Sequence, residues 1–78
     1  MRSTLYVGGF DRDTPEETLR GLFDRYGAVA EVRMIRRPSK DGRAFAYVTF
    51  ETCEAAEAAR TLDGSTLGGL RLRVDVAR

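Results

Sequence analysis

Apolar and polar residues alternate in four short segments of the chain, and this period of two predicts strands. The segments are residues 5–8, 29–36, 43–50 and 70–76. The third is the clearest, because Arg-Ala-Phe-Ala-Tyr-Val-Thr-Phe alternates throughout and is rich in strand-forming residues. We expect Gly8-Gly9 to end the first strand. Residues 38–42 are predicted to form a turn-rich loop between the second and third strands.

A different spacing between the first two strands predicts a helix over about 15–26. Its apolar residues are Leu19, Leu22, Phe23 and Tyr26. Pro15 suits the first helical position, and Thr14 can cap the helix in a capping box with Glu17. Gly27 is a suitable residue to end it.

A second helix is predicted between the third and fourth strands, with Thr52 as its cap and Asp63-Gly64 as its end. Its expected apolar face consists of Ala55, Ala58, Ala59 and Leu62. The order is therefore β-α-β-β-α-β, the split βαβ or ferredoxin-like arrangement of the α+β class. We expect a four-stranded antiparallel sheet with both helices on one face.

The other face of this sheet is predicted to expose aromatic rings. In the third strand Ala44, Ala46, Val48 and Phe50 suit the core, which leaves Phe45 and Tyr47 toward solvent, and the same alternation turns Tyr6 outward. The first and third strands are neighbours in this topology, so the three rings should adjoin. Cross-strand packing explains one exposed ring but explains three adjoining rings poorly. A platform on which unpaired bases stack explains them better.

Basic residues surround the predicted platform although the net charge is only +1. Residues 32–43 carry a net +4 and residues 70–78 a net +2, whereas residues 11–26 carry −2 and residues 51–63 carry −3. The acidic segments coincide mostly with the helices, so we expect a charge polarity that turns a polyanion toward the sheet. Charged loops are often only solvated, but the loop with Arg36, Arg37 and Lys40 can reach the backbone of a bound strand.

Missing residue types exclude most catalytic and metal sites. The chain has no His and one cysteine, Cys53, which argues against zinc and haem and excludes Ser–His and Cys–His catalysis. We therefore expect no catalytic residue, no metal and no cofactor. A single cysteine in so small a chain favours a reducing, intracellular compartment, either cytoplasmic or, in a eukaryote, nuclear. The 78 residues form one expected domain, 1–78, acting as a monomer without a membrane partner.

Two segments resemble the ribonucleoprotein motifs of a known family. Leu5-Tyr6-Val7-Gly8-Gly9-Phe10 resembles the hexapeptide motif, and residues 43–50 resemble the octapeptide motif. Both lie on the strands where the family has them, so the whole chain resembles an RNA recognition motif domain. Ala44 departs from the Gly that is common at the second octapeptide position, and we expect only a small packing adjustment there.

The resemblance implies roles for individual residues. Tyr6 and Tyr47 would stack on two successive bases, Phe45 would pack against sugars, and Arg43 would contact the linking phosphate. The expected partner is single-stranded RNA, with single-stranded DNA as a less certain one. The whole expected RNA-binding set is Tyr6, Arg33, Arg36, Lys40, Arg43, Phe45, Tyr47, Arg73 and Asp75. Asp75 could accept a hydrogen bond from a base. The alternative, at least equally favoured, is that Asp75 is only a solvated acidic residue at a strand end.

Two other functions occur on the same fold. Some relatives bind peptides through the helix face, but they have lost the sheet aromatics and carry Arg-x-Phe where this chain reads Leu67-Gly68-Gly69-Leu70. A protein–protein interaction module is therefore the alternative. Acylphosphatases share the topology and use an Arg and an Asn, and this sequence has no Asn. An enzyme is the least favoured reading.

Overall fold

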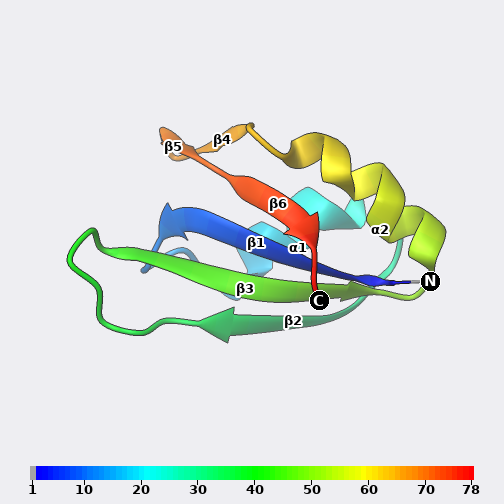
Figure 1. Cartoon of the computed structure of the whole chain (residues 1–78), viewed down its shortest axis with the longest axis horizontal. Coiled ribbons are helices and arrows are strands. Elements are labelled where there is room, and N and C mark those ends of the chain that lie inside the picture. Colours follow the sequence, from blue (N-terminus) through cyan, green and yellow to red (C-terminus); the bar gives the residue numbers. More distant parts are fainter. Residues whose placement is uncertain (1) are drawn as a thin grey trace.

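The computed structural model describes residues 2–78 and has the element order that the sequence predicts. The elements are β1 (Thr4–Asp11), α1 (Glu16–Asp24), β2 (Val29–Ile35), β3 (Arg43–Phe50), α2 (Cys53–Ala59), the 3₁₀ turn η1 (Arg60–Leu62), β4 (Thr66–Leu67), β5 (Leu70–Arg71) and β6 (Arg73–Val76). β2, β3, β1 and β6 form one antiparallel sheet in that order, and the two helices pack on one of its faces (Figure 1). The predicted α+β fold is confirmed.

The core lies between the sheet and the two helices, and the alternation along β3 builds half of it. Ala44, Ala46, Val48 and Phe50 are all buried, as predicted. The two alanines leave room for the helices, while Phe50 meets Phe23 of α1 edge to face at a centroid distance of 6.2 Å. Small and large residues thus interdigitate, as a closely packed core requires.

The first helix begins and ends inside its predicted bounds of 15–26. Pro15 precedes the first helical residue, and no side chain caps the N-terminus, so the capping box expected from Thr14 and Glu17 was wrong. The Thr14 carbonyl instead accepts a hydrogen bond from Arg36. A tertiary contact therefore holds the start of α1. Within residues 2–78, no helix has the length and apolar character needed to cross a membrane.

The second helix has the predicted cap but a rotated apolar face. The Thr52 hydroxyl accepts a hydrogen bond from the Ala55 amide at 3.1 Å. Ala56 is buried and Ala58 is exposed, so the placement of Ala58 in the core was wrong. The buried set Ala55, Ala56 and Ala59 also lies on one side of a helix, turned by one position from the predicted set.

A β-bulge in β1 replaces the strand end that Gly8-Gly9 was expected to make. Gly8 pairs with Phe45 and Phe10 pairs with Ala44, so Gly9 has no partner in β3. Its φ of +87° lies in the left-handed region that favours glycine. Simple alternation would turn Phe10 outward, and the extra residue instead returns it to the core, where it is fully buried.

The predicted fourth strand, 70–76, is divided into two. β4 and β5 form a small separate hairpin whose turn, Gly68-Gly69, has positive φ at both residues. The Leu72 amide then donates to the Ser65 carbonyl at 2.7 Å, and the ladder with β1 resumes only at β6. The fourth strand of the main sheet, β6, therefore begins only at Arg73, after the hairpin.

We expect Gly9→Ala to destabilise the domain, because its φ is strained for other residues and a Cβ there would lie 2.6 Å from the Arg71 carbonyl oxygen. The free energy of unfolding, measured by urea denaturation, should fall by about 1–3 kcal/mol. Gly21→Ala in α1 is the control: its Cβ would meet nothing within 4 Å, and it should gain about 0.5–1 kcal/mol. Equal stability of the two variants would contradict the structural role of the bulge.

Candidate nucleic-acid interface

Three aromatic side chains lie together in the middle of the uncovered sheet face. Tyr6 of β1 stands directly opposite Tyr47 of β3, and their ring centroids are 6.2 Å apart. Phe45 lies 5.6 Å from the Tyr6 ring and 5.9 Å from the Tyr47 ring. All three side chains are only half-buried, whereas Phe50 on the opposite face of β3 is 2% exposed. The face assignment made from alternation is confirmed, and we call these three residues the aromatic platform.

Gly8 gives the Tyr6 ring its position in the aromatic platform. A Cβ at Gly8 would overlap the Tyr6 hydroxyl group and would lie 2.8 Å from the ring carbon Cζ. Gly8 is also the residue of β1 directly opposite Phe45. The Tyr6 ring therefore lies over the backbone at Gly8, in the space that any side chain there would fill. The sequence indicated Gly8 only as part of a strand end and missed this role.

Charged side chains stand at both ends of the row of residues that contains the two tyrosines. Arg33 of β2 is directly opposite Tyr47, and Asp75 of β6 is directly opposite Tyr6. Opposite residues in an antiparallel pair share a face, so all four side chains lie on the uncovered face. Arg73 stands opposite Gly8 in the next row. The fold thus brings Arg33, Arg73 and Asp75 to the aromatic platform, as the sequence predicted.

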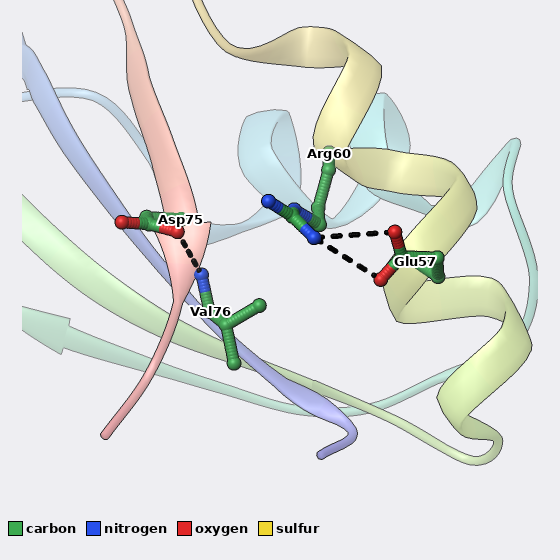
Figure 2. A network of polar contacts seen from close by, with 4 residues as sticks. All are labelled: Glu57, Arg60, Asp75 and Val76. Atoms are coloured by element: carbon green, nitrogen blue, oxygen red, sulfur yellow. Dashed lines mark hydrogen bonds and ion pairs between the residues drawn. The ribbon is translucent and has the colours of Figure 1, made fainter. Parts of the chain in front are cut away.

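Asp75 has a structural task that the sequence did not indicate. Its Oδ1 atom accepts a hydrogen bond from the Val76 amide at 2.8 Å (Figure 2). The Val74 amide donates to Asp63 Oδ1 at 2.9 Å in the same way. β6 is an outer strand of the sheet, and these two carboxylates occupy amides that would otherwise be open to pairing with another strand. One oxygen of Asp75 is therefore engaged with the backbone.

Arg36 of the loop between β2 and β3 joins two loops of the chain. Its Nε donates to the Arg12 carbonyl at 3.2 Å and its Nη2 donates to the Thr14 carbonyl at 2.9 Å. The Arg12 amide in turn donates to the Gly42 carbonyl at 2.9 Å. The guanidinium group thus holds the β1–α1 loop against the loop after β2. Lys40 of the same loop is exposed and makes no hydrogen bond or ion pair with any residue in the described range 2–78.

Asp41 organises the turn that leads into β3. Its carboxylate accepts hydrogen bonds from the Arg43 amide and the Ser39 hydroxyl, both at 3.0 Å. The Arg43 amide, followed by the Ser39 hydroxyl, lowers the pKa of Asp41 below its ordinary value. The turn places Arg43 at the first position of β3, where its side chain is exposed. Arg43 is therefore held at the end of the strand that carries Phe45 and Tyr47.

Two hollows lie beside α2, and neither is lined by Tyr6, Phe45 or Tyr47. One of them, of about 450 Å³, is lined in part by Arg73 and Asp75 of β6. The other, a groove of about 640 Å³, runs between α2 and the end of β6, and its lining includes Arg2, Ala58 and Val76. Among residues 2–78, no three His, Cys, Asp or Glu side chains are placed to hold a metal ion. The uncovered sheet face carries half-buried rings flanked by exposed charged side chains, which suits an extended chain laid across it.

Solved structures of similar shape include an RNA-binding protein and a domain with RNA bound. The RNA-binding protein PG1 is 33% identical, with a TM-score of 0.82 over 96% of this chain and 93% of that chain. The RRM of Rna15 with bound RNA (GU) is 28% identical, with a TM-score of 0.83 over 99% of this chain and 84% of that chain. The RRM3 domain of Mip6 is 19% identical, with a TM-score of 0.90 over 97% and 93% of the two chains, a likeness of fold alone.

The sequence match to a family agrees with this likeness. The family model described as RNA recognition motif matches residues 5–73, which include the whole of β3 and all of β1 except Thr4. The match thus covers most of the chain and includes Tyr6, Phe45 and Tyr47. This chain belongs to the RNA recognition motif family.

Proposed function

We propose that this protein binds single-stranded RNA by stacking unpaired bases on the aromatic platform. The observation that carries the proposal is that Tyr6, Phe45 and Tyr47 lie together on an uncovered sheet face. Their ring centroids are no more than 6.2 Å apart. Burial would stabilise the fold more than this partial exposure does, so the rings are placed for contact with something outside the chain. Membership of the RNA recognition motif family supports RNA as that partner.

The geometry of the rings favours separate bases over a duplex. The Tyr6 and Tyr47 rings are inclined by 66°, so each offers its own surface to one base. Bases paired in a helix have their faces covered by neighbours, and the deep major groove of A-form RNA does not admit a sheet. The RRM of Rna15, at 28% identity, has been solved with RNA bound, which supports the same class of ligand here.

Within the aromatic platform we assign stacking to Tyr6 and Tyr47 and sugar contacts to Phe45. The Phe45 ring is perpendicular to the Tyr47 ring and inclined by 33° to the Tyr6 ring, so it lies against both. A nucleotide that bridges two bases stacked on the tyrosines would pass its sugar over Phe45. Arg43 stands two residues before Phe45 on the same face and would meet the phosphate between those bases.

The remaining cations are proposed to hold the RNA backbone around the aromatic platform. Arg33 and Arg73 flank the two central strands, and Lys40 extends from the adjacent loop. Arg36 adds its charge mainly by keeping that loop in place, since two of its N–H groups already donate to backbone carbonyls. Asp75 keeps one carboxylate oxygen for a base donor.

The other expectations from the sequence remain predictions. We propose a binding module without a catalytic role, formed by one domain over 1–78 and acting as a monomer. Single-stranded DNA is a second expected ligand, because no side chain on the uncovered face is an evident reader of the 2′-hydroxyl. An intracellular, cytoplasmic or nuclear location rests only on the single cysteine, Cys53.

Replacing Tyr6 or Tyr47 by Ala should remove about 1–3 kcal/mol of RNA-binding free energy per ring, because each loses one stacked base. Stability should fall far less, since both rings are half-exposed. Fluorescence anisotropy with a short single-stranded RNA and thermal unfolding, both measured on each variant, check the two effects together.

Phe50→Ala is the control for these variants, because Phe50 lies in the same strand as Tyr47 but faces the core. Its loss should cost about 3–5 kcal/mol of folding free energy. If Tyr47→Ala destabilises the domain as much as Phe50→Ala and leaves RNA binding intact, the aromatic platform is only packing and the proposal is wrong.

Salt should weaken binding only moderately. Arg33, Arg43, Arg73 and Lys40 provide roughly two to four phosphate contacts, and each contributes about 0.7 to the slope for a single strand. The slope of log affinity against log salt concentration, from anisotropy titrations, should therefore be about −1.4 to −2.8. A slope near zero would contradict the phosphate contacts, and one steeper than about −5 would mean that charge and not stacking carries the binding.

A further inference from the structure

One carboxylate on the uncovered sheet face has no role in the binding described so far. Glu31 of β2 stands directly opposite Thr49 of β3, and it is exposed. Thr49 in turn shares a hydroxyl contact of 3.0 Å with Thr4 of β1. A negative charge on a surface that meets a polyanion opposes binding unless it accepts a hydrogen bond from the ligand.

Glu31 lies next to the position of one stacked base. Its neighbour two residues along β2 is Arg33, which stands directly opposite Tyr47. Glu31 is thus diagonal to Tyr47, a separation that a long side chain can span. A base stacked on Tyr47 would have Arg33 beside it and the Glu31 carboxylate one step further along the same strand.

The charged side chains of Glu31 and Arg33 do not interact with other side chains in the described part of the protein. Over the described residues 2–78, Glu31 and Arg33 take part in no side-chain hydrogen bond and no ion pair, either with each other or with a third residue. The ion pairs in that range join Arg20 to Glu16 and Arg60 to Glu57 on the helices. Both groups are therefore available to a ligand at no cost in internal contacts. Asp75 differs, because its Oδ1 atom is engaged by the Val76 amide.

An acceptor beside a donor on one strand matches the edge of one RNA base. The Watson–Crick edge of guanine presents two adjacent donors, N2–H₂ and N1–H, followed by the acceptor O6. A carboxylate accepts two parallel N–H donors, and an Arg side chain donates to O6. Uracil, cytosine and adenine do not offer two adjacent donors on that edge, so each would leave part of the carboxylate without a partner.

We infer that Glu31 and Arg33 select guanine at the base position over Tyr47, with Glu31 accepting from N1–H and N2–H₂ and Arg33 donating one N–H to O6. The guanidinium group has five N–H donors, so Arg33 keeps others for the RNA backbone. The inference rests on the proposed stacking of a base on Tyr47 and adds a sequence preference to it. The hydrogen bonds between Glu31 and guanine offset the repulsion between its carboxylate and the RNA phosphates, and no other base makes both of these bonds. For other bases Glu31 acts against binding, which is a second source of selectivity.

The test compares Glu31→Gln with the wild type on three RNAs: oligouridylate, and the same oligomer with one central guanosine or one central inosine. Inosine keeps N1–H and O6 but lacks the 2-amino group. The wild type should bind the guanosine RNA about 5- to 150-fold more tightly than oligouridylate, the range expected for one bidentate pair. The inosine RNA should fall between the two.

Glu31→Gln should weaken the binding of one RNA without weakening the binding of another. It should weaken binding of the guanosine RNA, remove the difference between guanosine and inosine, and leave oligouridylate bound as tightly as before or more tightly. Glu17→Gln is the matched control, because it makes the same charge change at an exposed position of α1, on the other side of the sheet. It should leave all three affinities unchanged relative to one another.

Two results would overturn the inference. One is a wild type that binds the three RNAs equally. The other is a Glu31→Gln variant that tightens all three by the same factor, which would make Glu31 only a repelling charge. Failure of the proposed function gives a different result: the wild type binds none of the RNAs, or Tyr47→Ala binds them as the wild type does.

Discussion

The antiparallel register between β1 and β3 decides which side chains form the core and which meet the ligand. Tyr6 pairs with Tyr47 and Val7 pairs with Ala46, so rings and small aliphatic residues alternate in step across the two central strands. A slip of one residue would turn the rings inward and the aliphatic residues to solvent. Because the buried set is fully enclosed by α1 and α2, the hydrophobic effect fixes this register and with it the position of the aromatic platform.

Two adjacent glycines of β1 allow the paired strands β1 and β3 to carry both the core and the aromatic platform. The bulge at Gly9 returns Phe10 to the core after the outward-facing segment that contains Tyr6. Gly8, one residue earlier, lets the Tyr6 ring lie over the backbone next to Phe45. Packing on one face and ring placement on the other therefore depend on adjacent residues that have no side chain.

Strand bounds, a helix cap and the directions of side chains in the strands could be predicted from short stretches of the sequence. The bounds of β3, the cap at Thr52 and the outward direction of Tyr6, Phe45 and Tyr47 follow from alternation and from capping chemistry, and all agree with the structure. The resemblance of two short motifs was enough to identify the family, which the match over residues 5–73 confirms.

Features that depend on distant contacts were not predictable in the same way. The bulge at Gly9 is set beside the Arg71 carbonyl, and the two carbonyls that engage Arg36 lie in a loop more than twenty residues earlier in the chain. The helix rotation that buries Ala56 in place of Ala58 depends on how α2 meets the sheet. Glu31 looks like an ordinary surface residue in the sequence, and the inference that it selects guanine depends on its position opposite Thr49 and beside Arg33.

Intermolecular nuclear Overhauser effects show whether RNA lies on the aromatic platform. In a complex with a short single-stranded RNA, the ring protons of Tyr6 and Tyr47 should each show contacts to base protons of neighbouring nucleotides. Phe45 should show contacts to sugar protons. If the RNA instead contacts the groove between α2 and β6, near Ala58 and Val76, and none of the three rings, the aromatic platform is not the RNA-binding site.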